Sequence, residues 1–180
     1  MPPDMSLSED HLARLRRIRL FLCDVDGVMT DGSILVGPGV EMKRFDIRDG
    51  FSLRLLQQEG MRVGWISARP SEATAERARD LKVDFVRQSP APKVTVIGEL
   101  LAELGVPWTD LCYMGDDIID LGALQRAGFS AAPADAVPEV RERVHYVSSH
   151  PGGRGAVREV VELILKTNGR WDAAVAKFAS

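Results

Sequence analysis

The sequence predicts an α/β fold in which helices cover both faces of a parallel, Rossmann-like sheet in three α/β/α layers. Short apolar runs alternate along the chain with segments whose apolar residues recur at helical spacing. The runs are apolar at nearly every position, which is typical of strands buried on both faces. Repeated strand–helix–strand units favour right-handed crossovers and therefore one parallel sheet.

Strands are expected at residues 19–24, 61–66, 83–86, 111–114 and 129–132. Helices are expected at 50–58, 71–81, 92–104, 117–127 and 156–166, and Gly60, Gly105 and Gly128 act as stop signals. A β-hairpin over 33–36 and 40–45 turns at Gly37-Pro38-Gly39. The hairpin interrupts the alternation just after the first strand, where it could lean over a site or pair with another subunit.

The length of 180 residues fits one domain over 1–180, with a helical arm at 1–18 and a tail at 168–180. Ser6-Leu7-Ser8-Glu9 resembles a capping box that opens the arm. Trp171 and Phe178 suit one face of a short helix, so the tail is expected to dock onto the body.

Composition limits the partners. With 23 Lys and Arg against 26 Asp and Glu, the net charge is −3, which argues against nucleic-acid binding. No apolar run is long enough for a membrane span, so neither a membrane nor a nucleic acid is expected as a partner and the cytoplasm is the expected compartment. Cys23 and Cys112 lie in apolar runs, which favours buried reduced thiols.

The chemistry is concentrated where the predicted strands end. The first strand runs into Asp24-Val25-Asp26-Gly27, which places two carboxylates on one side of the pleat at the carboxyl edge of the sheet. Ligand sites of open α/β sheets lie at that edge. Taken alone, the segment could also be a polar strand end followed by a turn.

Other polar residues fall on the same predicted edge. Ser67 closes the second strand, Lys93 opens the helix after 90–92, and Asp116, Asp117 and Asp120 follow Gly115. Each has an ordinary alternative, such as a helix cap or a surface lysine. Their joint occurrence at successive strand ends favours a site.

The residue types indicate phosphate chemistry with a metal. The carboxylates of Asp24, Asp26 and Asp116 would repel one another without a cation, and their oxygens suit Mg²⁺. Lys93 and the Ser67 hydroxyl could neutralise and bind phosphate oxygens. One carboxylate would then be available to attack phosphorus, and another to exchange protons.

These four motifs resemble the haloacid dehalogenase (HAD) superfamily of aspartate-nucleophile phosphatases. The resemblance implies that Asp24 is the nucleophile, that Asp26 is the general acid and base, and that Ser67 and Lys93 bind the phosphoryl group. It also implies Mg²⁺ held by the Asp24 and Asp116 carboxylates and the Asp26 carbonyl, supported by Asp117 or Asp120.

A closer resemblance, over residues 19–159, is to the 3-deoxy-D-manno-octulosonate 8-phosphate phosphatases, which lack a cap domain. It is carried by the hairpin leading into 43–50 and by the glycine-rich segment 152–159. It implies a phosphorylated sugar acid as substrate and a homotetramer whose hairpins associate. Lys43, Arg69, Arg154 and Arg158 are the candidate substrate-binding residues, although the glycines could equally form a plain loop before a helix.

Two segments depart from the family pattern. Ala68 stands where a glycine is expected after Ser67, and Ser89, Pro90 and Pro92 stiffen the approach to Lys93. Both changes bear on the choice of sugar. A nonulosonate 9-phosphate phosphatase, a receiver-type phosphoacceptor and a non-catalytic assembly domain are the alternative functions.

Overall fold

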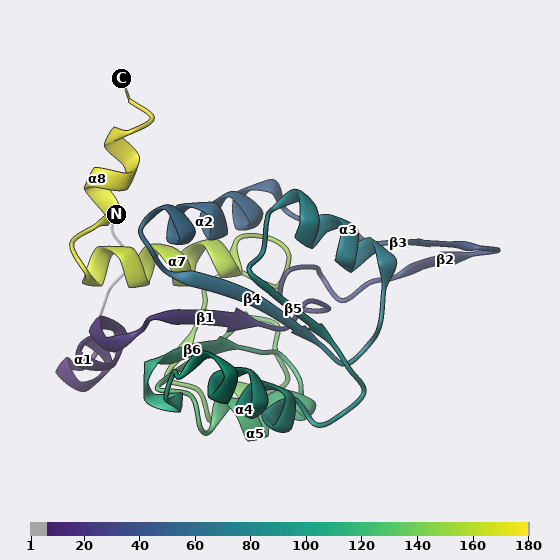
Figure 1. The fold of residues 1–180 in the computed structure, drawn as a ribbon, viewed down its shortest axis with the longest axis horizontal. Coiled ribbons are helices and arrows are strands. Elements are labelled where there is room, and N and C mark those ends of the chain that lie inside the picture. The colour runs from purple at the N-terminus through teal and green to yellow at the C-terminus, as the bar shows by residue number, and fades with distance from the viewer. Residues whose placement is uncertain (1–6, 180) are drawn as a thin grey trace.

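The computed structural model describes residues 7–179 and centres on a six-stranded parallel sheet (Figure 1). The strand order is β5-β4-β1-β6-β7-β8, which confirms the predicted fold class. Each of the four residues of β1 is buried, as expected for a central strand covered on both faces. The strands are β1 (Leu20–Cys23), β4 (Arg62–Ser67), β5 (Phe85–Gln88), β6 (Leu111–Met114), β7 (Phe129–Ala132) and β8 (Tyr146–Val147). β8 cannot be predicted from the sequence, because two residues carry no periodic signal.

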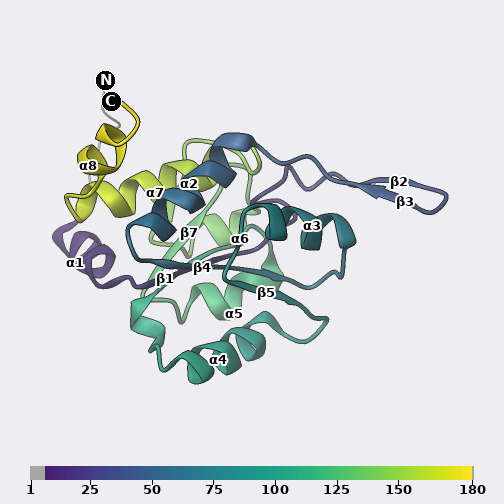
Figure 2. The same cartoon turned by 45° about the horizontal axis from the view of Figure 1, so that its top comes forward.

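Helices cover both faces of the sheet, as Figures 1 and 2 show. One apolar core joins the sheet to α1 (Glu9–Arg17), α2 (Ile47–Gln58), α3 (Glu72–Asp80) and α7 (Ala156–Thr167). A second core, on the other face, joins it to α4 (Lys93–Leu104), α5 (Leu121–Leu124) and α6 (Pro138–Arg141). Two cores of this kind are what buried parallel strands require.

Three helix starts differ from the prediction for local reasons. α2 begins at Ile47 rather than at 50, because the Asp46 carboxylate accepts a hydrogen bond from the Arg48 amide at 2.7 Å and caps the helix. The segment 117–127 forms a 3₁₀ turn, η2 (Ile118–Asp120), before the short α5. Ser6 lies outside the described residues, and Ser8 is the residue that caps α1.

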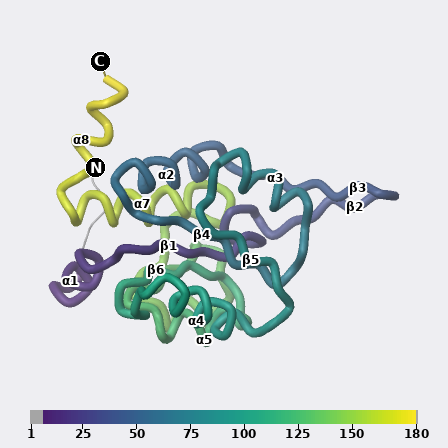
Figure 3. The backbone as a smooth tube through the Cα atoms, viewed as in Figure 1, coloured from purple at the N-terminus to yellow at the C-terminus, as the bar shows by residue number. Residues whose placement is uncertain are grey.

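The hairpin projects away from the body (Figure 3). It pairs β2 (Leu35–Gly37) with β3 (Val40–Met42) in antiparallel register and is shorter than the predicted segments. Four of its apolar side chains are exposed by half or more: Leu35, Val36, Val40 and Met42. At its base, Glu41 binds Arg69 at 2.6 Å and the Ser71 hydroxyl at 2.5 Å.

The C-terminal residues dock onto the body, as their aromatic spacing predicts. α8 (Trp171–Ala176) follows α7, and the Trp171 ring lies beneath the cationic groups of Arg158 and Lys166 at 5.0 and 5.3 Å. The Phe178 ring lies 5.4 Å from that of Phe51. The tail therefore adds to the face of the sheet that α2 and α7 cover.

Cys23 and Cys112 are buried free thiols, as predicted. Over residues 7–179, none of the helices combines the length and the apolar character that a membrane crossing demands. A short 3₁₀ helix, η1 (Trp108–Asp110), leads into β6.

Candidate active site

Asp24 lies directly after β1 at the carboxyl edge of the sheet. Its backbone amide bonds the Met114 carbonyl of the neighbouring strand at 2.9 Å, so the sheet itself fixes its position. The carboxylate accepts a hydrogen bond from the Val25 amide at 2.7 Å and lies 2.9 Å from the Lys93 ammonium. The residue is only 5% exposed. Asp24 is therefore a buried carboxylate with one oxygen facing a fixed cation.

Lys93 is held between Asp24 and Asp120. Its ammonium lies 2.7 Å from Asp120 Oδ1, which also accepts a hydrogen bond from the Tyr113 hydroxyl at 2.6 Å. The other oxygen of Asp120 accepts the backbone amides of Asp116 and Asp117 at 3.1 and 3.2 Å. Asp120 is fully buried, and these four donors satisfy its lone pairs. These contacts orient Lys93 and the loop that carries Asp116.

A metal ion fits this cluster. Carboxylate oxygens of Asp24, Asp116 and Asp120 lie within 4.8 Å of one another. Asp116 Oδ1 is buried and has no hydrogen-bond partner among the described residues. A buried carboxylate oxygen without a donor is costly, and a hard divalent cation would satisfy it. The donor set consists of oxygen atoms alone, as Mg²⁺ prefers.

The pKa values of the cluster show that it holds an excess of negative charge. Burial raises the pKa of Asp116 to about 8, and the charges of Asp24 and Asp120 add to this effect. Burial also raises the pKa of Asp24 to about 6, against the lowering effect of Lys93. Burial by itself would lower the pKa of Lys93, but the two carboxylates beside it raise it above its ordinary value. One lysine does not neutralise three acids, which leaves room for a cation.

Gly27 allows Asp116 to approach the Asp24 loop. Its φ is +94°, and a Cβ at this position would lie 2.0 Å from Asp116 Oδ2. A side chain would therefore be strained and would collide with the cluster. The glycine of the first motif is required by the site as well as by the turn.

Asp26 points to a different partner from Asp24. Its carboxylate oxygens lie 2.8 and 3.1 Å from the ammonium of Lys43, the residue that follows β3. Lys43 was expected among substrate-binding residues from the sequence. The structure places its ammonium beside the second aspartate of the first motif.

The remaining predicted residues are placed as follows. The Ser67 hydroxyl, at the end of β4, makes a local turn with the Arg69 backbone, and the Arg69 side chain pairs with Glu41 at 2.6 Å. Asp117 is exposed and caps η2. Arg154 is exposed, and Arg158 pairs with Glu162 at 2.6 Å.

The glycine-rich segment packs against the loop that follows Asp26. A Cβ on Gly152 would lie 1.8 Å from the Gly27 carbonyl oxygen, and the Gly153 amide bonds the Val28 carbonyl at 2.9 Å. Fully buried Asp49 accepts the backbone amides of Gly155 and Arg158 at 3.1 and 2.8 Å. These glycines support the loop after Asp26 by close backbone contact, a role that the sequence does not distinguish from a plain loop.

Tyr113 is a residue of this cluster that the sequence does not identify. Its hydroxyl is fully buried and bonds Asp120, but the residue sits inside an apolar strand where an aromatic ring is expected for packing alone. The one signal in the sequence is a hydroxyl in an otherwise apolar strand, since a buried hydroxyl needs a partner.

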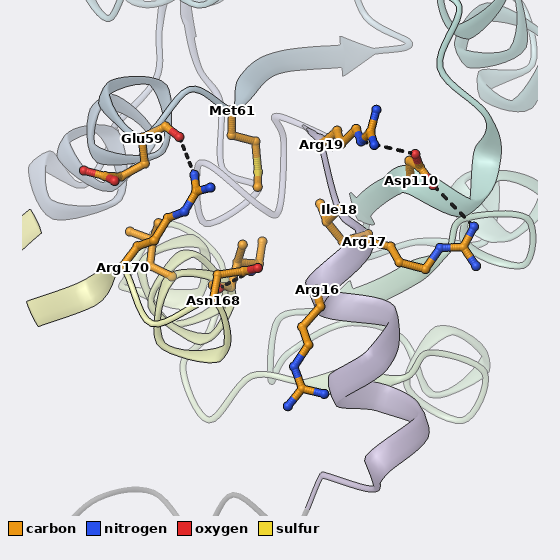
Figure 4. Close-up of a pocket in the computed structure, with 11 residues that line it drawn as sticks. Arg16, Arg17, Ile18, Arg19, Glu59, Met61, Asp110, Asn168 and Arg170 are labelled. Atoms are coloured by element: carbon orange, nitrogen blue, oxygen red, sulfur yellow. Dashed lines mark hydrogen bonds and ion pairs between the residues drawn. The ribbon is translucent and has the colours of Figure 1, made fainter. Parts of the chain in front are cut away.

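A cavity of about 450 Å³ lies at the opposite, amino edge of the sheet (Figure 4). Arg17 and Arg19 lie 3.6 Å from Asp110, and Arg170 donates to the Glu59 carbonyl at 2.6 Å. Most of its charged groups thus have partners within the chain, and among residues 7–179 the acids that line it, Glu59 and Asp110, form no cluster. The candidate active site is the carboxyl edge.

Comparisons with known proteins show the family to which the chain belongs. No protein-family model matches the chain. A 3-deoxy-D-manno-octulosonate 8-phosphate phosphatase from Yersinia pestis is 40% identical over 169 residues, which are 93% of this chain and 90% of that protein.

Solved structures are similar over nearly the whole chain. The phosphatase of the same name from Moraxella catarrhalis, in complex with magnesium, phosphate and KDO, has a TM-score of 0.91 and 35% identity over 94% of this chain and 98% of that one. A Legionella pneumophila protein assigned to HAD superfamily subfamily III A has a TM-score of 0.90 and 31% identity, with 94% of each chain covered. With these identities and this coverage, the chain belongs to the 3-deoxy-D-manno-octulosonate 8-phosphate phosphatase family of the HAD superfamily.

Proposed function

We propose that this chain is a Mg²⁺-dependent phosphomonoesterase that releases phosphate from 3-deoxy-D-manno-octulosonate 8-phosphate through an aspartyl-phosphate at Asp24. The observation that carries the proposal is the cluster of Asp24, Asp116 and Lys93 at the carboxyl edge. A buried carboxylate beside a fixed ammonium and an unsatisfied carboxylate oxygen fits a phosphoryl group with its metal. Family membership supplies the substrate.

Magnesium would be held by the carboxylates of Asp24 and Asp116 and by the main-chain carbonyl of Asp26. Asp120 would support the ion by fixing Lys93 and the loop that carries Asp116. Asp117 would support it by capping η2, the turn that leads to Asp120. When bound, the ion would neutralise negative charge on the phosphate and on the acids around it.

The chain's own residues would carry the reaction. Lys93 and the Ser67 hydroxyl would bind phosphoryl oxygens, so that phosphorus faces the Asp24 carboxylate. Asp24 would attack in line while Asp26 gives a proton to the departing sugar alcohol. Asp26 would then take a proton from the water that cleaves the aspartyl-phosphate, which restores both carboxylates.

Arginines near the carboxyl edge would recognise the sugar acid. A guanidinium binds a carboxylate through two parallel hydrogen bonds, and exposed Arg154 is a candidate for this role. Arg69 and Arg158 are further candidates, although in the isolated chain they pair with Glu41 and Glu162. Binding through them would require exchange of these partners.

We further propose that the enzyme is a homotetramer assembled through its hairpins and works in the cytoplasm. An exposed apolar hairpin with unpaired edges favours association with another chain. Buried free thiols are typical of reducing compartments. Light scattering is expected to give the mass of four chains, and Val36→Lys is expected to lower it, because a charge would then lie in the interface. A monomeric wild type, or an unchanged mass in the variant, would contradict the assembly.

Phosphate release tests the proposed activity. The enzyme would be assayed with Mg²⁺ and with EDTA on the octulosonate 8-phosphate, a nonulosonate 9-phosphate, hexose phosphates and p-nitrophenyl phosphate. We expect Mg²⁺-dependent preference for the octulosonate ester. Preference for the nonulosonate ester would support the proposed phosphatase chemistry and contradict the assigned substrate. Inactivity toward every ester would overturn the proposal.

A further inference from the structure

Lys43 is a buried lysine whose ammonium contacts the second aspartate of the Asp24–Gly27 motif. Its side chain is 0% exposed, although the residue directly follows the exposed hairpin strand β3. The ammonium lies 2.8 and 3.1 Å from the two Asp26 oxygens and donates to the Thr74 hydroxyl at 3.0 Å. The contact with Asp26 Oδ1 is an ion pair, since this oxygen is buried and has no hydrogen-bond partner among the described residues, whereas Asp26 Oδ2 and the Thr74 hydroxyl accept hydrogen bonds from Lys43.

The pair fixes both partners. A buried ammonium is costly unless it is paired with a counterion, and Asp26 is the carboxylate within ion-pair distance of Lys43 among residues 7–179. In the same part of the chain, Lys43 is also the side chain that bonds the Asp26 carboxylate. The Asp26 side chain is 21% exposed, so the contact with Lys43 holds a carboxylate that also meets solvent.

We propose that Lys43 is a positioning residue that holds the Asp26 carboxyl group in place to protonate the leaving alcohol; this inference rests on the proposed function. In that step the bond between phosphorus and the sugar oxygen breaks as the bond from Asp24 to phosphorus forms. The Asp26 proton passes to the sugar oxygen, and the resulting carboxylate is stabilised by Lys43, which keeps its own proton.

Contacts at the base of the hairpin fix the position of Lys43. Glu41, two residues earlier, binds Arg69 and the Ser71 hydroxyl at the start of α3. Thr74, the other partner of Lys43 besides Asp26, is fully buried in that helix. The hairpin is thus anchored to the start of α3 through Glu41 and to its interior through Lys43. Lys43 in turn contacts Asp26, the proposed acid.

The choice of leaving group separates this role from a merely structural one. An alkyl phosphate needs an acid to protonate its leaving oxygen, whereas p-nitrophenolate leaves readily without one. The specificity constant kcat/KM reports the steps up to departure of the alcohol, so it would be measured for the octulosonate ester and for p-nitrophenyl phosphate. We expect Lys43→Met to lower it about 100-fold for the sugar ester and by less than about threefold for the aryl ester.

Conservative and neighbouring variants provide the controls. Lys43→Arg keeps the charge and is expected to restore most of the loss. Arg44→Met removes a charge one residue along, where the side chain is exposed and pairs with Asp31, and is expected to leave both esters unaffected. In an Asp26→Asn background, Lys43→Met should cause no further loss, because its effect acts through Asp26.

Melting curves and light scattering would establish that each variant is folded and assembled. If Lys43→Met does not fold, Thr74→Val removes one contact and should give a smaller loss that is again confined to the alkyl ester. Equal losses on both esters, no loss on either, or additive losses with Asp26→Asn would overturn the proposal. The rates of the wild type alone test the proposed function. The ratio of kcat/KM between the two esters in each variant tests the positioning role of Lys43.

Discussion

The two edges of the central sheet carry their charges in opposite arrangements. At the amino edge, exposed Arg17 and Arg19 lie 3.6 Å from Asp110, so that opposite charges meet near solvent. At the carboxyl edge, buried acids of like charge gather around a single lysine, Lys93. Folding alone accounts for the first arrangement, since exposed pairs of this kind cost little and contribute little.

The carboxyl edge, by contrast, works against the stability of the metal-free chain. It buries an unpartnered oxygen of Asp116 and requires a glycine in a left-handed conformation beside it. Features that cost stability and persist are typical of functional sites. The difference teaches that the arrangement of charged groups distinguishes the candidate active edge of this sheet from the opposite edge.

Replacing the proposed nucleophile should have the largest effect. Asp24→Asn is expected to lower kcat at least about a thousandfold, because the amide cannot form the bond to phosphorus that we assign to the Asp24 carboxylate. Its melting temperature should stay near that of wild type, since Lys93 keeps Asp120 as a partner. The matched change at the other edge, Asp110→Asn, should leave kcat within about twofold. Substantial turnover by Asp24→Asn would remove the nucleophile from this position.

Metal binding sharpens the comparison further. Mg²⁺ is expected to raise the melting temperature of wild type by several degrees, because it binds the folded cluster and not the unfolded chain. Asp116→Asn should abolish most of this shift together with activity, while Asp110→Asn should keep it. Equal Mg²⁺ shifts in Asp116→Asn and wild type would require another set of ligands.

The pH dependence of the stability of the metal-free protein follows from the Asp116 carboxyl group. Burial and its acidic neighbours raise the pKa of Asp116 to about 8 in the folded state, against 3.8 for an ordinary aspartate. Folding then takes up a proton between these values, so stability in EDTA should fall as the pH rises from about 4 to about 8. Chemical denaturation at several pH values should show this slope weakened in Asp116→Asn.

Alanine substitutions at two glycines, Gly27 and Gly60, form a matched pair with smaller expected effects. Gly27 and Gly60 have φ of +94° and +84°, but only at Gly27 would a Cβ meet another group within 4 Å. Both alanine variants should lose about 1–2 kcal/mol of unfolding free energy through backbone strain. Gly27→Ala alone should also lose Mg²⁺ binding and activity, as measured by melting shifts and phosphate release. Normal activity in Gly27→Ala would show that Asp116 can occupy another position.

The smallest effect is expected at the amino edge. Arg19→Ala should change the unfolding free energy by less than about 1 kcal/mol, because its guanidinium is exposed and pairs with Asp110 at 3.6 Å. Phosphate release should not change. A loss of activity in this variant would give the arginine-lined cavity a role in the reaction.

The sequence predicted the layers of the fold because strands such as β1, β6 and β7 are apolar at nearly every position. It also predicted that Asp24, Lys93, Asp116 and Asp120 share one edge, since parallel strands end together. The structure brings these four residues into direct contact or into one cluster.

Pairings between distant segments were beyond the reach of local patterns. The Tyr113 contact to Asp120 depends on how two elements pack, and Lys43 reaches Asp26 only because the hairpin folds back onto α3. The segment after Asp117 forms a 3₁₀ turn because the Asp120 carboxylate binds the amides before it, which helix periodicity does not record. The sequence identifies the groups, and tertiary packing decides their partners.

The most direct test of the central claim is to locate the phosphoryl group during turnover. Asp26→Asn, in which water attack on the intermediate should be slow, would be mixed with Mg²⁺ and p-nitrophenyl phosphate, quenched in acid, digested and examined by mass spectrometry. We predict the mass of one phosphoryl group on the peptide that contains Asp24, and none when Asp24→Asn is added. Label on another residue, or the same label without Asp24, would contradict the assignment of the carboxyl edge as the catalytic one.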